Sequence, residues 1–141
     1  MDVDERTWAL MQERLGYSDE EMALFRANPR NEDVLSKADQ LIGKTMVAEV
    51  IESHGCNSQH RVGDKFYIDG AGNLISKRCP KRMCLFAMLP LAMLGFATHE
   101  LIYAGIDPND MRFKRLGCND VGLKCGGWGR IVMELKIEER S

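Results

Sequence analysis

The sequence contains no Cys-x-x-Cys pair, although five of its 141 residues are cysteine. This removes the strongest sequence evidence for a zinc ribbon, a thioredoxin-like site or a ferredoxin-type cluster. There is also no Gly-x-Gly-x-x-Gly segment between a strand and a helix, which argues against dinucleotide binding. Internal repeats and low-complexity linkers are absent too. Without these patterns, we expect one compact domain with a helical appendage. The function of the protein must then depend on residues that lie far apart in the sequence.

The chain has no excess of positive charge. Its net charge is -2, so it lacks the global basic surface of a nucleic-acid-binding protein, and we expect no nucleic-acid partner. Residues 1–44 carry 6 basic and 10 acidic side chains, whereas residues 45–127 carry 10 basic and 8 acidic ones. The basic excess therefore lies in the part that contains the cysteines, which suits an anionic ligand, a thiolate-rich centre or an acidic partner.

Long apolar segments are lacking as well. The first six residues have neither the basic nor the apolar region of a secretory signal, so we expect a cytoplasmic, reducing location. In that compartment an odd number of cysteines favours metal binding, catalysis or plain burial over disulfides. The longest apolar run, residues 83–97, has 15 residues and contains Pro90 and Gly95. It is shorter than the roughly 20 residues of a membrane-spanning helix, so we predict a buried core helix pair and no membrane span.

Residues 1–44 have the pattern of a helical N-terminal extension. Apolar side chains recur at near-helical spacing before Gly16, and Ser18 with Glu21 forms a capping-box pattern that opens a helix over residues 20–27. Asn31 is predicted to cap a third helix that ends at Gly43. Short amphipathic helices are not stable alone in water. We therefore expect them to pack on the rest of the chain, on a protein partner or in a homo-oligomer.

Residues 45–141 predict an α+β domain that contains the cysteines and histidines. Segments rich in β-branched residues or with alternating polarity predict strands at 45–51, 62–68, 74–76, 112–116 and 130–137. Proline is favoured at the first position of a helix, so Cys79-Pro80 is predicted to open one, which Pro90 must kink or restart. The expected fold is a small antiparallel β-sheet packed against one kinked helix.

Cys79 is the strongest single candidate for chemistry. It lies among four basic residues, and cationic neighbours favour the thiolate, which is the form that binds metal or attacks an electrophile. The unpaired N–H groups at a helix start act in the same direction. The plain alternative is that Cys79 only caps or packs under the helix, because free cysteine is among the most buried residue types. Cys84 is predicted to be a small core hydrophobe.

A second candidate group surrounds Cys56 and His60. Three residues separate them in a loop bordered by glycine, a spacing that can bring sulfur and imidazole to one metal. His60 could equally be a surface residue that fixes the loop by a hydrogen bond. Cys118 follows a basic segment, and Trp128, in a glycine-rich loop, is expected to be buried against the sheet unless it covers a pocket or interface. His54 and His99 are expected to be ordinary residues, without a role at the site.

These motifs resemble an uncharacterised family of short prokaryotic proteins. Its members show Cys-x-x-Gly-His-x-Val-Gly-Asp after a strand, then a Cys-Pro helix start, then Cys-Pro-Asp before a final strand. The corresponding segments here begin at Cys56, Cys79 and Cys118, within about residues 47–137. This chain departs from the pattern at Gln59, where the family has glycine, and at Asn119, where it has proline. The resemblance implies a shared set of four residues, Cys56, His60, Cys79 and Cys118, and no established activity.

Three functions remain open at this point. The first is a metal-binding protein in which Cys56, His60, Cys79 and Cys118 hold zinc or an iron–sulfur cluster, acting as an accessory or subunit of a larger enzyme system. The second is a thiol enzyme with Cys79 as nucleophile and His60 as base. The third is a non-catalytic partner protein with structural cysteines.

The basic residues near these cysteines add an anion-binding hypothesis. Lys81 and Arg82 follow Cys79, and the segment containing Arg112, Lys114 and Arg115 precedes Cys118. Guanidinium and ammonium groups at these positions would hold an anionic substrate. The sequence also predicts that Cys79→Ser lowers metal content or thiol reactivity more than Cys84→Ser does.

Overall fold

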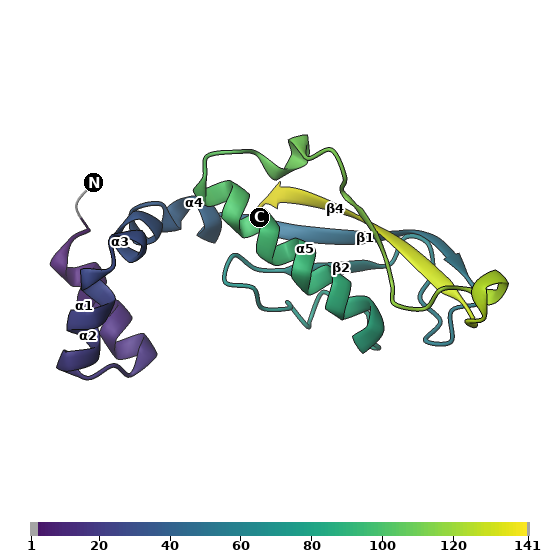
Figure 1. Cartoon of the computed structure of the whole chain (residues 1–141), viewed down its shortest axis with the longest axis horizontal. Coiled ribbons are helices and arrows are strands. Elements are labelled where there is room, and N and C mark those ends of the chain that lie inside the picture. Colours follow the sequence, from purple (N-terminus) through teal and green to yellow (C-terminus); the bar gives the residue numbers. More distant parts are fainter. Residues whose placement is uncertain (1–2, 141) are drawn as a thin grey trace. The chain divides into compact units, whose positions relative to one another are not determined.

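The computed structural model describes residues 3–140, and its contacts divide the chain into two compact units. Unit 1 extends to Gln40 and unit 2 begins at Leu41, four residues before the boundary predicted from the sequence. Unit 1 is helical, whereas unit 2 combines an antiparallel sheet with one long helix (Figure 1). The α+β prediction is therefore confirmed.

Unit 1 contains α1 (Glu5–Leu15), α2 (Asp19–Ala27) and α3 (Pro29–Ser36), and α4 (Ala38–Ile42) spans the boundary. The predicted capping box at α2 is present: Ser18 Oγ accepts the Glu21 N–H at 3.1 Å, and the Glu21 carboxylate accepts the Ser18 N–H at 3.0 Å. Trp8 of α1 is buried and meets Phe25 of α2 edge-on, with ring centroids 6.0 Å apart. The helices of this unit therefore share a small core of their own.

The prediction that Asn31 caps a single third helix is wrong. Asn28 caps α3, because its side-chain oxygen accepts the Arg30 N–H at 3.0 Å and Pro29 occupies the first helical position. The Asn31 side chain instead donates to the carbonyl of Phe25 at 2.8 Å, which ties α3 to the end of α2. The predicted helix is interrupted after Ser36 and resumes as α4.

Unit 2 is built on a four-stranded sheet in the order β2-β1-β4-β3, with every neighbouring pair antiparallel. The strands are β1 (Lys44–His54), β2 (Lys65–Ile68), β3 (Arg115–Gly117) and β4 (Arg130–Glu139). Predicted residues 74–76 form only an isolated bridge, in which Leu74 pairs with Ile68. The central pairing of β1 with β4 runs from Lys44 opposite Glu139 to His54 opposite Arg130 and is bulged between Val50 and Glu52.

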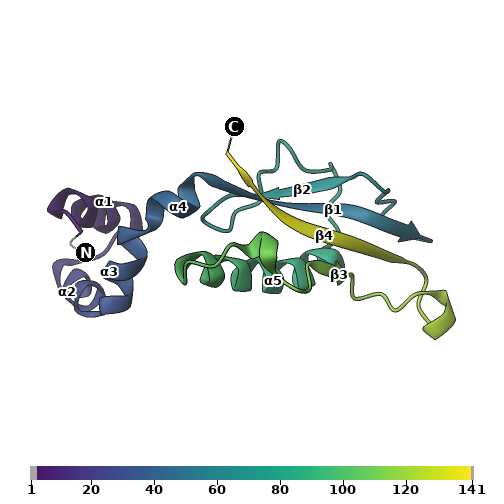
Figure 2. The ribbon, with the colours of Figure 1, turned by 90° about the horizontal axis from the view of Figure 1, so that it is seen from above.

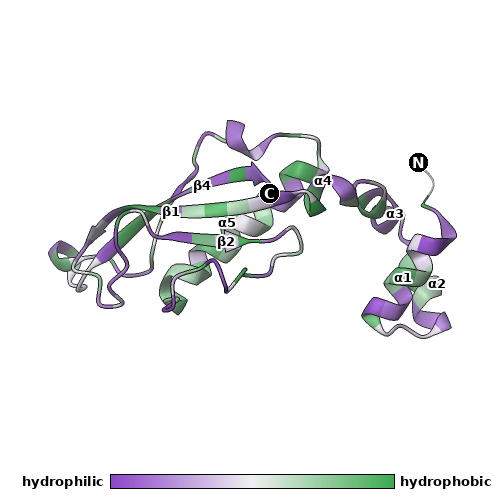
Figure 3. Ribbon diagram, turned by 180° about the vertical axis from the view of Figure 1, so that it is seen from behind, coloured by the Kyte–Doolittle hydropathy of each residue, from purple (hydrophilic) through white to green (hydrophobic). Residues whose placement is uncertain are grey.

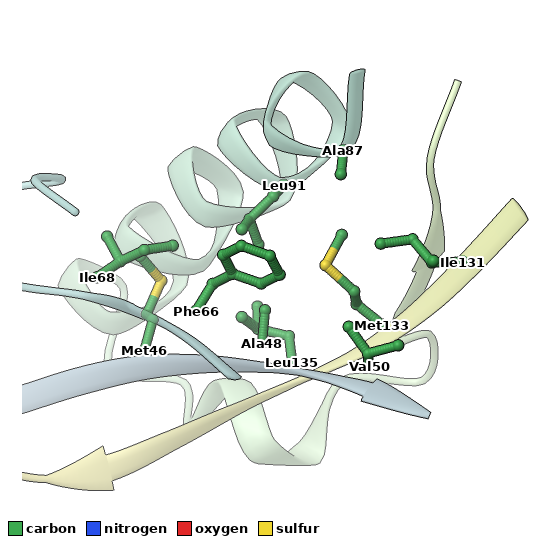
Figure 4. Close-up of a cluster of buried hydrophobic side chains, with 10 residues drawn as sticks. All are labelled: Met46, Ala48, Val50, Phe66, Ile68, Ala87, Leu91, Ile131, Met133 and Leu135. Carbon is green, nitrogen blue, oxygen red and sulfur yellow. The ribbon is translucent and has the colours of Figure 1, made fainter. Parts of the chain in front are cut away.

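Helix α5 (Leu85–Tyr103) lies along one face of this sheet (Figure 2). Alternate residues of the strands point toward it, and together they form the core (Figure 4), which consists of Met46, Ala48, Val50, Phe66, Ile68, Ala87, Leu91, Ile131, Met133 and Leu135. Two short 3-10 turns, η1 (Pro108–Asp110) and η2 (Leu123–Cys125), lie in the connections that flank β3.

The start of α5 corrects a central expectation. The helix begins at Leu85 with Cys84 at its N-cap position, so Cys79-Pro80 does not open it. It also continues through Pro90 as one helix instead of the expected helix pair. Proline cannot bond back to the carbonyl four residues earlier. The carbonyl left free, that of Phe86, accepts the N–H of Asn119 at 3.1 Å, so a loop outside the helix satisfies it.

The outer face of α5 is apolar and uncovered within the described chain. Leu85, Phe86, Leu89, Met93 and Phe96 each expose more than half of their surface. Among residues 3–140, α5 is the one helix long and apolar enough to cross a membrane by length and composition. Its inner face packs on the sheet through Ala87 and Leu91. In Figure 3 the strands that lie over α5 carry hydrophobic residues, coloured green, whereas the connections are largely hydrophilic and purple.

The packing of Phe66 predicts a large stability effect. Phe66 is fully buried between the sheet and α5. We expect Phe66→Ala to lower the free energy of unfolding by about 3–5 kcal/mol, because the cavity left behind cannot collapse fully. Leu89→Ala, on the exposed face of α5, should change it by less than about 0.5 kcal/mol. Urea unfolding of both variants checks this, and losses of similar size would contradict the described core.

Candidate functional site

A cavity of about 230 Å³ lies at the N-terminal end of α5. Its walls come from the loop after β1, the start of α5 and the connection between β3 and β4. The lining residues are Cys56, Asn57, Ser58, His60, Cys84, Phe86, Ala87, Cys118, Asp120, Trp128, Gly129, Arg130 and Ile131. Three of the five cysteines and the most buried histidine therefore face one space.

Two glycines allow the walls of this cavity to meet. A side chain at Gly129 would overlap the carbonyl group of Gly55, and one at Gly55 would crowd the carbonyl of Trp128. Gly55 also has a φ of 66°, in the left-handed region that glycine tolerates. The loop that carries Cys56 thus passes backbone to backbone against the segment before β4.

Asp120 organises the opposite wall. Its carboxylate accepts N–H groups from Gly122 at 2.9 Å, Trp128 at 3.1 Å and Gly129 at 3.1 Å. The Gly122 N–H lowers the pKa of Asp120 most, followed by that of Gly129, against a smaller opposing effect of burial and with help from Trp128. Asp120 is therefore ionised, and its hydrogen bonds to three backbone N–H groups hold this loop in place. Trp128 itself is exposed at the cavity mouth, so its expected burial against the sheet is wrong.

His60 is buried and forms part of the cavity wall. Its Nε2 accepts the backbone N–H of Cys84 at 3.3 Å, and its Nδ1 lies 4.0 Å from the Asp64 carboxylate. Its ring meets Phe66 edge-on at 5.2 Å. Burial lowers the pKa of His60, and the nearby charge of Asp64 opposes this only in part. A neutral imidazole therefore directs one lone pair at Cys84, the N-cap residue of α5.

Cys84 has the environment that the sequence predicted for Cys79. Burial raises the pKa of the Cys84 thiol, but hydrogen bonds from the Ser58 hydroxyl and from the N–H groups of Phe86 and Ala87 outweigh it. The pKa of Cys84 is therefore below its ordinary value. These two N–H groups belong to the first turn of α5, where negative charge is favoured. The prediction that Cys84 is only a core hydrophobe missed this position.

Cys79 lies elsewhere. Its sulfur accepts the Tyr67 N–H at 3.3 Å and lies 3.5 Å from the Tyr67 carbonyl, and it does not line the cavity. Arg78 stacks over the Tyr67 ring at 3.9 Å. Cys79 therefore covers backbone groups on the outer edge of β2, where an edge strand needs a partner. Its predicted place at a helix start is wrong.

The predicted anion-binding residues do not form one group. Arg112, Lys114 and Arg115 share a hollow of about 170 Å³ with Glu134, and neither Lys81 nor Arg82 lines it. Arg115 pairs with Glu134 at 2.9 Å, and Lys114 donates to the carbonyl of Asn109 at 3.0 Å. Arg112 lies over the Phe113 ring at 5.1 Å. The exposed Lys81 and Arg82 belong to the segment that precedes α5.

The side chains on the cavity wall do not form the coordination sphere of one ion in this structure. Within residues 3–140, no three His, Cys, Asp or Glu side chains lie close enough together to hold a metal ion. Zinc needs its sulfur ligands at about 2.3 Å, so side chains on the cavity wall would have to turn inward to bind it. Cys56, His60, Cys84 and Cys118 share this wall, whereas Cys79 and the exposed Cys125 do not.

The comparisons with known proteins add no assignment. A scan against protein-family models, a search of curated proteins and a search of solved structures each find no match to this chain. The resemblance to the family of short prokaryotic proteins therefore stays a prediction.

His60 and His99 predict a pH dependence of stability. Burial lowers the pKa of His60 and of His99, so below a pH of about 6.5 the unfolded chain binds more protons than the folded one. The free energy of unfolding should therefore fall as pH decreases from about 7 to about 5. Urea unfolding across this range checks the sign, and His99→Phe should flatten part of the slope. Stability that stays constant or rises toward pH 5 would contradict the neutral imidazoles.

Proposed function

We propose that this protein binds a soft transition-metal centre, zinc or an iron–sulfur cluster, at the cavity beside the start of α5. The ligands in this proposal are Cys56, Cys84, Cys118 and His60. The observation that carries it is that three thiols and one neutral imidazole line a single cavity. Cys84 replaces Cys79 in the set expected from the sequence, because Cys84 lies on the cavity wall and at the helix start.

The chemistry of these ligands favours soft or borderline metals. Thiolate and imidazole select zinc, copper or iron–sulfur centres over magnesium and calcium. The N–H donors at the start of α5 and the Ser58 hydroxyl stabilise the thiolate of Cys84, which is the form that coordinates metal. The His60 imidazole is neutral, as a metal ligand must be, and would exchange its bond from the Cys84 N–H for one to the metal.

The spacing of the possible ligands favours a cluster over a single ion. Ligands around one ion must approach within a few ångströms of one another, and no such group exists among the described residues. A cluster distributes its ligands over several iron atoms, so the sulfur atoms of its cysteines lie farther apart. Three cysteines with a histidine as the fourth ligand would give a redox centre, whereas a closed set around zinc would be structural.

A second candidate, thiol chemistry, is favoured by the same helix start. Cys84 has a lowered pKa and lines a cavity, which is the environment of a reactive cysteine. In this alternative Cys84 takes the nucleophilic role that the sequence suggested for Cys79. His60 Nε2 accepts the backbone N–H of Cys84, so its lone pair is already used to position the start of the helix. This hydrogen bond must break before His60 Nε2 can act as a base.

The two cysteines provide a matched test. Protein purified without oxygen should contain stoichiometric zinc or iron by elemental analysis, with visible absorption in the iron case. Cys84→Ser should remove most of the metal, whereas Cys79→Ser should retain it, which reverses the order expected from the sequence. If the two variants lose metal equally, or if the parent protein contains none, the metal proposal fails. Absence of metal together with rapid alkylation of Cys84 alone would support the thiol alternative.

The role of an accessory protein or enzyme subunit in the cytoplasm is part of this proposal. All five cysteines are free, as a reducing compartment requires. Unit 1 exposes Leu10, Leu15 and Leu24, which are available to a protein partner or a second copy. We expect Leu24→Glu to reduce self-association or partner binding, measured by sedimentation velocity of the full chain. Val62→Glu, at an exposed position of unit 2, is the control, and equal behaviour of the two variants would contradict contact through the N-terminal helices.

A further inference from the structure

The outer face of α5 carries apolar side chains at the spacing of a coiled coil. Phe86, Leu89, Met93 and Phe96 follow one another at intervals of three, four and three residues, which places them on one stripe of the helix. Each of these four residues, called the outer seam below, exposes more than half of its surface. The exposed Glu100 continues the same pattern four residues later. The outer seam therefore ends in a carboxylate.

The charges at the two ends of α5 oppose the dipole of the helix. The exposed Arg82 precedes the first helical residue by three positions, and Glu100 lies in the last turn. A cation is disfavoured near the N-terminus of a helix, and a carboxylate is disfavoured near its C-terminus. Within residues 3–140, neither Arg82 nor Glu100 forms an ion pair. Each charge would be favoured at the opposite end of a second, antiparallel helix.

The outer seam is complementary to itself in the antiparallel direction. Positions 86 and 96, 89 and 93, and 82 and 100 all have their midpoint at position 91. Two antiparallel copies of α5 that cross at this level place Phe86 of each copy opposite Phe96 of the other, and Leu89 opposite Met93. The same register places Arg82 opposite Glu100. A two-fold axis makes every one of these contacts twice, as in an isologous dimer.

The exposed area of this face is close to what a stable dimer needs. With about 200 Å² for each large side chain, the exposed parts of Leu85 and the outer seam amount to roughly 700 Å² per copy. Stable protein–protein interfaces bury about 800 Å² on each partner. In Figure 2 α5 lies on the outside of unit 2, with the sheet on its other side. The outer seam of a second copy would cover this area with side chains of the same kind.

We propose that α5 is the interface of a two-fold symmetric homodimer, in which the outer seams of two copies pack antiparallel and Arg82 of each copy pairs with Glu100 of the other. This interface belongs to unit 2 and depends neither on the N-terminal helices nor on metal binding. An anionic membrane surface suits the outer seam less well, because its negative potential repels the carboxylate of Glu100.

A charge swap tests the register in the full chain by sedimentation velocity. The parent protein should be dimeric at about 50 μM and dissociate on dilution. Arg82→Glu and Glu100→Arg should each raise the dissociation constant of the dimer about tenfold, because like charges then meet at two symmetric contacts. The two changes together should restore it to within about threefold of the parent value.

A second double variant separates register from net charge. Arg82→Glu with Asp110→Arg has the same net charge as the swap, but position 110 lies outside the register, so this variant should stay weakened. Equal dissociation constants in the two double variants would overturn the pairing of Arg82 with Glu100. A parent protein that is monomeric at about 100 μM would overturn the dimer itself.

The apolar contact is tested by a charge within the outer seam. Met93→Glu should be monomeric, whereas Val62→Glu, at an exposed position outside α5, should remain dimeric. The same measurements on the Leu24→Glu background exclude association through unit 1. A dimer that persists in Met93→Glu, or a parent monomer that instead binds vesicles of anionic phospholipid, would overturn the proposal.

Stability and metal content separate this result from misfolding and from the metal proposal. Below the dissociation constant of the dimer, Leu89 and Met93 are exposed in the monomer, so Leu89→Ala and Met93→Glu should leave its free energy of unfolding nearly unchanged. Met93→Glu should also contain as much metal as the parent protein. A Met93→Glu monomer that is strongly destabilised when dilute would contradict the exposed position of this residue.

Discussion

The antiparallel pairing of β1 with β4 is the constraint on which unit 2 depends. It continues to the end of β1 at His54, opposite the first residue of β4, so the loops beyond these ends must meet. Gly55 and Gly129 let them meet without side chains between the backbones. The same register turns Met46, Ala48 and Val50 of β1 toward α5 and thereby forms the core. Sheet register, core and candidate site are consequences of one strand pair.

The sequence predicted most of the strands because their signals are local. Residues 45–51 and 130–137 are rich in β-branched side chains or alternate in polarity, and both lie in strands. The start of α5 was missed because two local signals competed. Proline is favoured at the first turn of a helix, which pointed to Cys79-Pro80, but the helix begins at Leu85, near the start of the apolar run of residues 83–97. Packing against the sheet decided between them.

The candidate site was predictable only in part for the same reason. Cys56, His60 and Cys118 line one cavity, but within residues 3–140 no three such side chains lie close enough together to hold a metal ion. Cys79 does not line this cavity, because its segment follows the edge of β2, where its sulfur contacts the backbone of Tyr67. No short-range pattern distinguishes a cysteine that covers a strand edge from one that begins a helix. The signal available for Cys84 was its position at the start of the apolar run of residues 83–97.

The two buried histidines show how one helix creates two different environments. His60 directs its Nε2 at the start of α5, where the N–H of Cys84 satisfies it, so this imidazole fixes the position of the helix. His99 lies near the other end of α5, and its buried Nε2 has no hydrogen-bond partner within residues 3–140. Burial lowers the pKa of both, but only the first nitrogen is used by the fold itself. An imidazole nitrogen that the fold leaves unpaired costs stability, because it loses its hydrogen bond to water and gains no other.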